Sequence, residues 1–148
     1  MARAWLGEEL VSLFIQQNAA DQRHALDAAA FVNAAAPHDR ELRIAALMHD
    51  VGKRHARLGV LGRVGVSVAI KTGLPLKPRG QDYRDHGAIG AAELAAIGAH
   101  RVAVDFARSH HEERPDSISA PAWELLVAAD QPPKTWVTIR RWITSTIR

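Results

Sequence analysis

The chain has 148 residues, a formal net charge of +3 and no cysteine. This length fits one domain with one hydrophobic core, and the absence of cysteine excludes disulfides and thiolate metal sites. The mildly basic charge suits a phosphate-bearing ligand, but it is far below that of a dedicated nucleic-acid binder. Hydrophobic residues make up 47% of the chain and aromatic residues only 5%. Because alanine dominates the hydrophobic fraction, the composition favours an all-α fold.

Neither a secretion signal nor a membrane span is expected. Acidic residues Glu8 and Glu9 stand where a signal peptide would need an apolar run. The longest apolar stretch, residues 58–70, is interrupted by Arg63 and is too short to cross a bilayer. We therefore expect a cytoplasmic protein.

In the first third of the chain, apolar side chains recur at helical spacing. They predict a helix over residues 4–17, a second with Asp21 as its N-cap, and a third capped by Asp39. The third helix ends in the segment His49-Asp50-Val51-Gly52-Lys53, where Gly52 is a natural terminator. Three consecutive helices are therefore expected before the middle of the chain.

The middle of the chain, residues 54–85, is harder to interpret. Residues 60–70 suit either a short helix or an apolar flap, and both alternatives stay open. Residues 74–80 contain two prolines and a glycine, which predicts a loop. We expect this segment to cover the functional site and to set its specificity.

Helical periodicity returns at residue 86. One helix is expected over residues 86–98, one over residues 100–112, and one from residue 119 or 120 to Asp130. Residues 134–148 are basic and aromatic, which suits a last helix packed on the bundle. A surface for anionic lipid or nucleic acid is the alternative for this tail. The whole chain is therefore expected to form a single-domain helical bundle of about six to eight helices.

Histidines and aspartates gather at the ends of these expected helices. His49-Asp50 closes an apolar helix, so its side chains would lie at the rim between core and solvent. An adjacent imidazole and carboxylate can bind one metal, and the second carboxylate oxygen can bridge to another. A single His-Asp pair is weak evidence, because His38-Asp39 is a second such pair and is explained as a helix cap.

The ordered set of candidate residues is more specific than any one pair. In chain order it comprises His24, His49-Asp50-Val51-Gly52-Lys53, His86, His110-His111 and Asp130. This set resembles the HD-domain phosphohydrolases, most closely the branch with a His-Asp-Ile-Gly motif (HDIG). The resemblance covers about residues 21–130, and residues 131–148 follow as a C-terminal segment. It implies a helical bundle around a metal centre.

The resemblance also implies a role for each residue of the set. One metal would be held by His24, His49, Asp50 and Asp130. Asp50 would bridge to a second metal, held also by His86 and His110. His111 would be a further ligand or a phosphate contact, and Lys53 would face the substrate phosphate. The catalytic residues would thus be Lys53, Asp50 and His111, and a protonated His111 could protonate the leaving oxygen.

Two departures from the family pattern limit the expected substrate and the expected number of metals. Branch members that degrade cyclic dinucleotides carry a Gly-Tyr-Pro signature, which this sequence lacks. Members with a third metal carry an acidic residue four positions before the first histidine, where this chain has Ala20. The expected cofactors are therefore one or two divalent transition metals, namely manganese, iron or zinc.

The expected function is hydrolysis of a phosphate mono- or diester by a metal-activated hydroxide. The substrate would be a phosphorylated small molecule such as a nucleotide. Two alternatives stay open: a di-iron oxygenase on a related helical fold, which would need oxygen, and a catalytically silent regulatory HD module, against which the complete ligand set argues. His55 and His100 match no part of the motif and are expected to be ordinary histidines.

Overall fold

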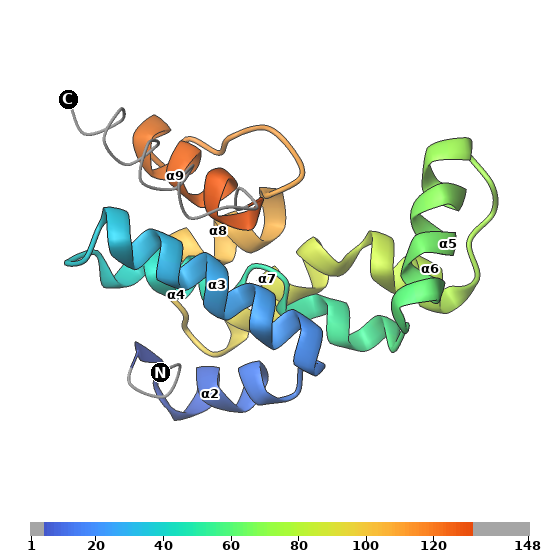
Figure 1. The fold of residues 1–148 in the computed structure, drawn as a ribbon, viewed down its shortest axis with the longest axis horizontal. Helices are drawn as coiled ribbons and strands as arrows, with labels where there is room; N and C mark the ends of the chain where they lie inside the picture. Colours follow the sequence, from blue (N-terminus) through green and yellow to red (C-terminus); the bar gives the residue numbers. More distant parts are fainter. Residues whose placement is uncertain (1–4, 132–148) are drawn as a thin grey trace.

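The structure, a computed structural model, describes residues 5–131 (Figure 1). These residues form eight α-helices and one 3₁₀ helix, with no strand among them. The α-helices are α2 (Glu8–Ile15), α3 (Ala19–Ala35), α4 (Arg40–Met48), α5 (Val60–Thr72), α6 (Pro78–Arg84), α7 (His86–Ala96), α8 (Arg101–Ser109) and α9 (Ala120–Asp130). The 3₁₀ helix is η1 (Val51–Ala56). The predicted all-α fold is confirmed for this part of the chain.

Helix α4 is the central helix of the body. It packs against α3, α8 and α9, and every residue from Ile44 to Met48 is buried. Leu47 and Met48 lie in one core cluster with Phe106 of α8 and Leu126 of α9. Because this apolar run continues to the end of the helix, the residues that follow it, His49 and Asp50, lie inside the protein.

The N-caps of α3 and α4 differ in how well the sequence predicts them. Asp39 caps α4 as predicted, since its carboxylate accepts a hydrogen bond of 3.0 Å from the Leu42 N–H. The cap of α3 is Asn18, whose side-chain oxygen accepts from the N–H groups of Ala20 and Asp21. The prediction of Asp21 as the cap was wrong, because asparagine is an equally good cap and stands three residues earlier. The Asp21 carboxylate is thereby left for other partners.

The structure decides between the two alternatives for the middle of the chain. Residues 60–72 form the helix α5, which ends at Gly73 in the left-handed conformation, with φ at +69°. The predicted loop is shorter than expected, because Pro78 begins α6. Helix α6 packs against η1 and α7, whereas α5 contacts mainly α6 and projects from the body (Figure 1).

The arm formed by α5 is apolar on its exposed side. Leu61 is 87% exposed, and Val64 and Val68 are more than half exposed. Between α5 and α6 lies a cavity of about 610 Å³, lined mainly by apolar side chains such as Val66 and Leu76. No histidine or carboxylate lines this cavity, so its chemistry does not match the metal site expected from the sequence.

Two remaining sequence predictions concern the C-terminal tail and the absence of a membrane span. The basic and aromatic tail, residues 134–148, lies outside the described residues, and the expectation of a last helix there stays a prediction. Within residues 5–131, no helix combines the length and the apolar character that crossing a membrane requires.

Candidate metal centre

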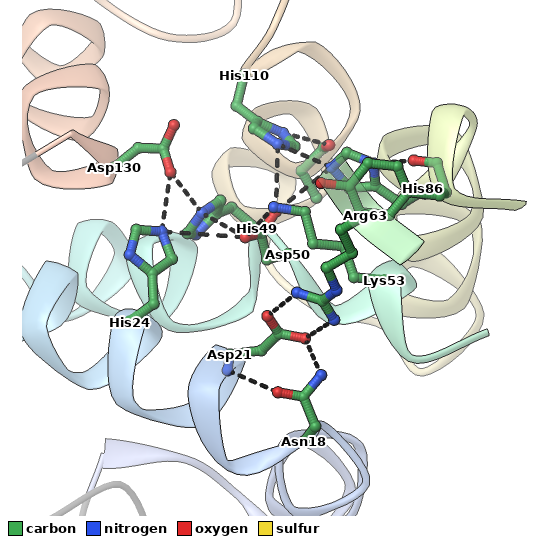
Figure 2. A network of polar contacts seen from close by, with 12 residues as sticks. Asn18, Asp21, His24, His49, Asp50, Lys53, Arg63, His86, His110 and Asp130 are labelled. Carbon is green, nitrogen blue, oxygen red and sulfur yellow. Dashed lines mark hydrogen bonds and ion pairs between the residues drawn. The ribbon is translucent and has the colours of Figure 1, made fainter. Parts of the chain in front are cut away.

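Seven histidine and aspartate side chains converge from helices that are far apart in the sequence, and Figure 2 labels all of them except His111. Helix α3 supplies His24, the end of α4 supplies His49 and Asp50, the start of α7 supplies His86, the end of α8 supplies His110 and His111, and the end of α9 supplies Asp130. His49, Asp50, His86 and His110 are buried. The structure therefore brings together all six metal ligands expected from the sequence, and His111 with them.

The first group of ligand atoms comes from His24, His49, Asp50 and Asp130. One atom of each residue lies within 4.8 Å of the others. The Asp130 Oδ1 atom is 3.0 Å from Nε2 of His24 and 3.0 Å from Nε2 of His49. Two imidazoles and two carboxylates at this spacing match the donor set that zinc, manganese or iron accepts.

The second group comes from His86, His110 and His111, whose ligand atoms also lie within 4.8 Å of one another. Asp50 stands between the two groups. Its Oδ2 atom is 3.5 Å from Nε2 of His49, while its Oδ1 atom is 3.4 Å from Nε2 of His86 and 3.5 Å from Nε2 of His110. Each oxygen of Asp50 therefore faces a different group, as a carboxylate that bridges two metals would.

Backbone carbonyl groups fix the orientation of the three buried imidazoles. The Nδ1 atoms of His49, His86 and His110 lie 2.9, 2.7 and 2.9 Å from the carbonyl oxygens three residues earlier. Because a carbonyl oxygen only accepts, each Nδ1 must carry the hydrogen and donate it. In the neutral ring the lone pair is then on Nε2, the atom that faces the cluster. This is the usual outer support of a metal-binding histidine.

Two features of the cluster fit a cation. The Nε2 atoms of His86 and His110 are only 3.2 Å apart, and two neutral nitrogens that both carry lone pairs repel each other at that distance. The Oδ1 atom of Asp50 is buried and has no hydrogen-bond partner among the described residues, which is costly for a carboxylate. A metal between these three atoms would satisfy all of them.

The carboxylates strongly perturb the protonation of His49. Burial alone would lower the pKa of His49, but the Asp50 and Asp130 carboxylates raise it to about 10. Burial would likewise raise the pKa of Asp50, whereas His49, His110 and His86 hold it well below its usual range. The pKa of Asp130 is also lowered against the effect of burial, by His24 and His49. Without a metal, a protonated His49 therefore supplies the positive charge that the carboxylates require.

His111 is exposed, whereas His24 is half-buried and the other three histidines of the cluster are buried. Burial of part of the ring, together with His110, His86 and Lys53, lowers the pKa of His111 to about 4. Its ring lies 4.0 Å from that of His110, measured between centroids. A neutral His111 fits the role of a further ligand, and it leaves the expected proton donor without its proton near neutral pH.

Lys53 lies at the edge of the cluster. Its ammonium is 2.6 Å from the Oδ2 atom of Asp50, and its side chain is 16% exposed. His55 and His100 lie elsewhere, as predicted: His55 pairs with Glu93 and His100 with Glu41, at 2.8 and 2.7 Å. Both are ordinary surface histidines.

Sequence reasoning missed the residues that border the cluster on the α3 side. The Arg63 guanidinium reaches from α5 to the buried Asp21 carboxylate, which also accepts a hydrogen bond from Asn18 (Figure 2). The only indication in the sequence was that Arg63 interrupts the apolar stretch of residues 58–70. Its partner lies 42 residues earlier in the chain, so no local pattern could have identified it.

Comparison of the chain with protein-family models, curated proteins and solved structures finds no match.

Proposed function

We propose that this protein is a metal-dependent phosphohydrolase of the HD type, which cleaves a phosphate mono- or diester in a nucleotide-like substrate. The observation that carries the proposal is the position of Asp50, whose two oxygens face two separate groups of imidazoles. Paired metal sites that share a bridging carboxylate are typical of phosphate ester hydrolysis. The resemblance of the ordered His and Asp residues to the motif of HD-domain enzymes supports the same conclusion.

The described residues supply donors for two metals. His24, His49, Asp50 and Asp130 would hold one, and Asp50, His86, His110 and His111 would hold the other. Divalent metals bound there would lower the pKa of a water molecule and offset the charge of the phosphoryl oxygens. The role of the protein is to orient the ligands. Carbonyl groups of α4, α6 and α8 hold the rings of His49, His86 and His110 with Nε2 toward the cluster.

Lys53 is the residue best suited to bind the phosphoryl group itself. Its ammonium contacts the Asp50 oxygen that belongs to the first group of ligands, so a phosphate at the cluster would lie within its reach. A fixed positive charge at that place stabilises the negative charge that develops on the phosphoryl oxygens. This charge favours a hydrolase over the di-iron oxygenase, whose chemistry has no need of it.

Metal analysis combined with a hydrolysis assay tests the proposal. The purified protein is stripped with a chelator, reloaded with manganese, iron or zinc, and assayed with p-nitrophenyl phosphate and bis-p-nitrophenyl phosphate under air and under nitrogen. We expect one or two metals per chain and hydrolysis that depends on metal but not on oxygen. Turnover that requires oxygen would support the oxygenase instead, and tight metal binding without any turnover would support the silent module.

Two variants connect the activity to the proposed site. The double variant His49→Ala, Asp50→Ala should lose both metal and hydrolysis, because it removes ligands from both groups. The matched control is His100→Ala, which changes a histidine that lies outside the cluster and should leave both unchanged. Full metal content in the double variant would mean that the metal binds elsewhere.

A further inference from the structure

A second, smaller cavity lies beside the metal centre and is cationic. Its volume is about 320 Å³, and its lining includes Lys53, Arg54, Arg57 and Arg63 together with the amides Gln16 and Asn18. No carboxylate lines it. The volume is at the lower end of that of small-molecule sites, which suits one small anionic group better than a whole nucleotide.

Lys53 belongs to both the cationic pocket and the metal centre. It lines the pocket, and its ammonium is 2.6 Å from Asp50. Figure 2 shows Asn18, Asp21 and Arg63 next to Lys53 and the imidazole cluster. Asp21, the partner of Arg63, also precedes the candidate ligand His24 by one turn of α3. One small molecule could therefore occupy the metal centre and the pocket together.

The guanidinium of Arg63 is held rigidly at the wall of this pocket. Its Nη1 and Nη2 atoms donate to the two oxygens of Asp21 at 2.5 and 2.6 Å, and its Nε donates to the Leu58 carbonyl at 3.2 Å. Asn18 fixes Asp21 in turn, at 2.7 Å. Because a guanidinium has five N–H donors, this arrangement orients the group and still leaves donors for a ligand.

Arg57 supplies charge that no carboxylate among the described residues neutralises. Lys53 pairs with Asp50, Arg54 with Glu93 and Arg63 with Asp21, whereas the exposed Arg57 has no such partner in the described part of the chain. Its backbone is also unusual, with φ at +48°, a left-handed conformation that non-glycine residues seldom adopt. Such strained positions cluster at ligand-binding sites.

We propose that the substrate carries a second phosphate group, which binds in the cationic pocket of Lys53, Arg54, Arg57 and Arg63 while the scissile phosphate ester binds at the metal centre. This inference rests on the proposed function. Arginine pairs well with phosphate, whose oxygens accept several charge-assisted hydrogen bonds. The pocket therefore selects small molecules with two phosphate groups over those with one.

A comparison of two substrates tests the selection. The metal-loaded enzyme is assayed with adenosine 5′-monophosphate and adenosine 3′,5′-bisphosphate, and p-nitrophenyl phosphate serves as a substrate without a second phosphate. We expect a kcat/KM about tenfold or more higher for the bisphosphate, as one charge-assisted contact would give. Arg57→Asn should remove most of this preference by raising KM, because asparagine tolerates the left-handed backbone but lacks the charge.

Control variants distinguish a loss of bisphosphate preference from a loss of folding or of basal turnover. Arg57→Lys should retain part of the preference, and Arg40→Asn, at the far end of α4 from His49, should retain all of it. Arg57→Asn should keep its metal content, and Arg40→Asn should leave the rate with p-nitrophenyl phosphate unchanged. Equal kcat/KM for the two nucleotides, or an equal loss on all three substrates in Arg57→Asn, would overturn the inference.

A binding measurement separates this inference from the proposed function. Calorimetry with inorganic pyrophosphate on the chelator-treated protein needs neither metal nor turnover. We expect binding that Arg57→Asn weakens about tenfold and Arg40→Asn does not. If no ester is hydrolysed but this binding remains, the proposed function fails and the anion pocket stands. Hydrolysis of monophosphates without pyrophosphate binding or bisphosphate preference leaves the function standing and removes the pocket.

Discussion

Asp50 and Lys53 together set the electrostatics of the site. Asp50 is buried, and its Oδ2 atom accepts from Lys53 while its Oδ1 atom has no hydrogen-bond partner among the described residues. The lysine thus neutralises one side of the carboxylate and leaves the other side to the imidazoles of His86 and His110. We propose that metal and Lys53 compete for the same carboxylate charge and that, in the proposed hydrolase, Lys53 turns toward the substrate phosphate when metal is bound.

Removal of the Lys53 charge should therefore lower turnover without weakening metal binding. We expect Lys53→Ala to lower the hydrolysis of a phosphate ester by roughly 10–1000-fold, the effect of losing one transition-state donor. Metal should be retained or bound more tightly, because the competing cation is gone. Steady-state kinetics and metal analysis measure the two effects.

Two further lysine variants make this prediction specific. Lys53→Arg should recover only part of the rate, because the guanidinium is larger and differently shaped. Lys71→Ala removes an exposed lysine of α5 and should change neither rate nor metal content. Unchanged turnover in Lys53→Ala would exclude the lysine from the mechanism, and loss of metal would assign it a structural role instead.

At the scale of elements, close packing of η1 and α7 brings the two halves of the metal centre together. A Cβ atom added to Gly52 would lie 2.0 Å from the His86 carbonyl oxygen and 2.8 Å from the Gly90 nitrogen. Gly52 was expected to terminate a helix, but its φ is not among the positive values. The residue is needed because the backbones of η1 and α7 touch there. That contact holds Asp50 next to His86.

Gly52→Ala should destabilise the protein by about 2 kcal/mol or more, the scale of strain from overpacking. It should also weaken metal binding, because η1 must move away from α7. The control is Gly65→Ala in α5, where an added Cβ meets nothing within 4 Å. That change should be neutral or stabilise by up to about 1 kcal/mol, from helix propensity. Urea unfolding compares the variants, and equal stability of the two would contradict the packing argument.

At the scale of the whole molecule, the metal centre joins α3, α4, α7, α8 and α9, so its charge state bears on the stability of the fold. In the metal-free protein His49 has a pKa of about 10, above the value of 6.5 for an unperturbed histidine. Its stabilising effect is therefore complete below about pH 6.5 and is lost as the pH rises toward 10. Asp50 and Asp130 have lowered pKa values, so their effect is lost as the pH falls below about 4.

The metal-free protein should accordingly be most stable near pH 6.5, because the lowered pKa of His111 removes stability as the pH falls from 6.5 toward 4. We expect its Tm to fall between pH 6.5 and 9, by roughly 5 °C or more. The metal-loaded protein should have a higher Tm at every pH in this range. Its Tm should not decline between pH 6.5 and 9, because protons compete with metal for the ligands and metal therefore binds more tightly as the pH rises. Calorimetry with and without chelator measures both curves. A metal-free Tm that is flat or rises from pH 6.5 to 9 would be inconsistent with a protonated His49.

Local patterns in the sequence were sufficient for most of the helices. The cap at Asp39 and the end of α4 follow from periodicity, capping and residue type, all of which are read from neighbouring positions. The candidate ligands His24, His49, Asp50, His86, His110 and Asp130 came instead from the resemblance of their order to the HD-domain motif. The cap at Asn18 and the start of α6 at Pro78 were missed because competing local signals lay within a few residues.

Only the tertiary structure decided how these residues face one another. The two oxygens of Asp50 divide between groups supplied by different helices, and His24 meets Asp130 across 106 residues of sequence. The contact of Arg63 with Asp21 and the cationic pocket beside Lys53 likewise depend on the direction in which α5 leaves the body. Such contacts are set by the packing of helices on a shared core, which no pattern of neighbouring residues encodes.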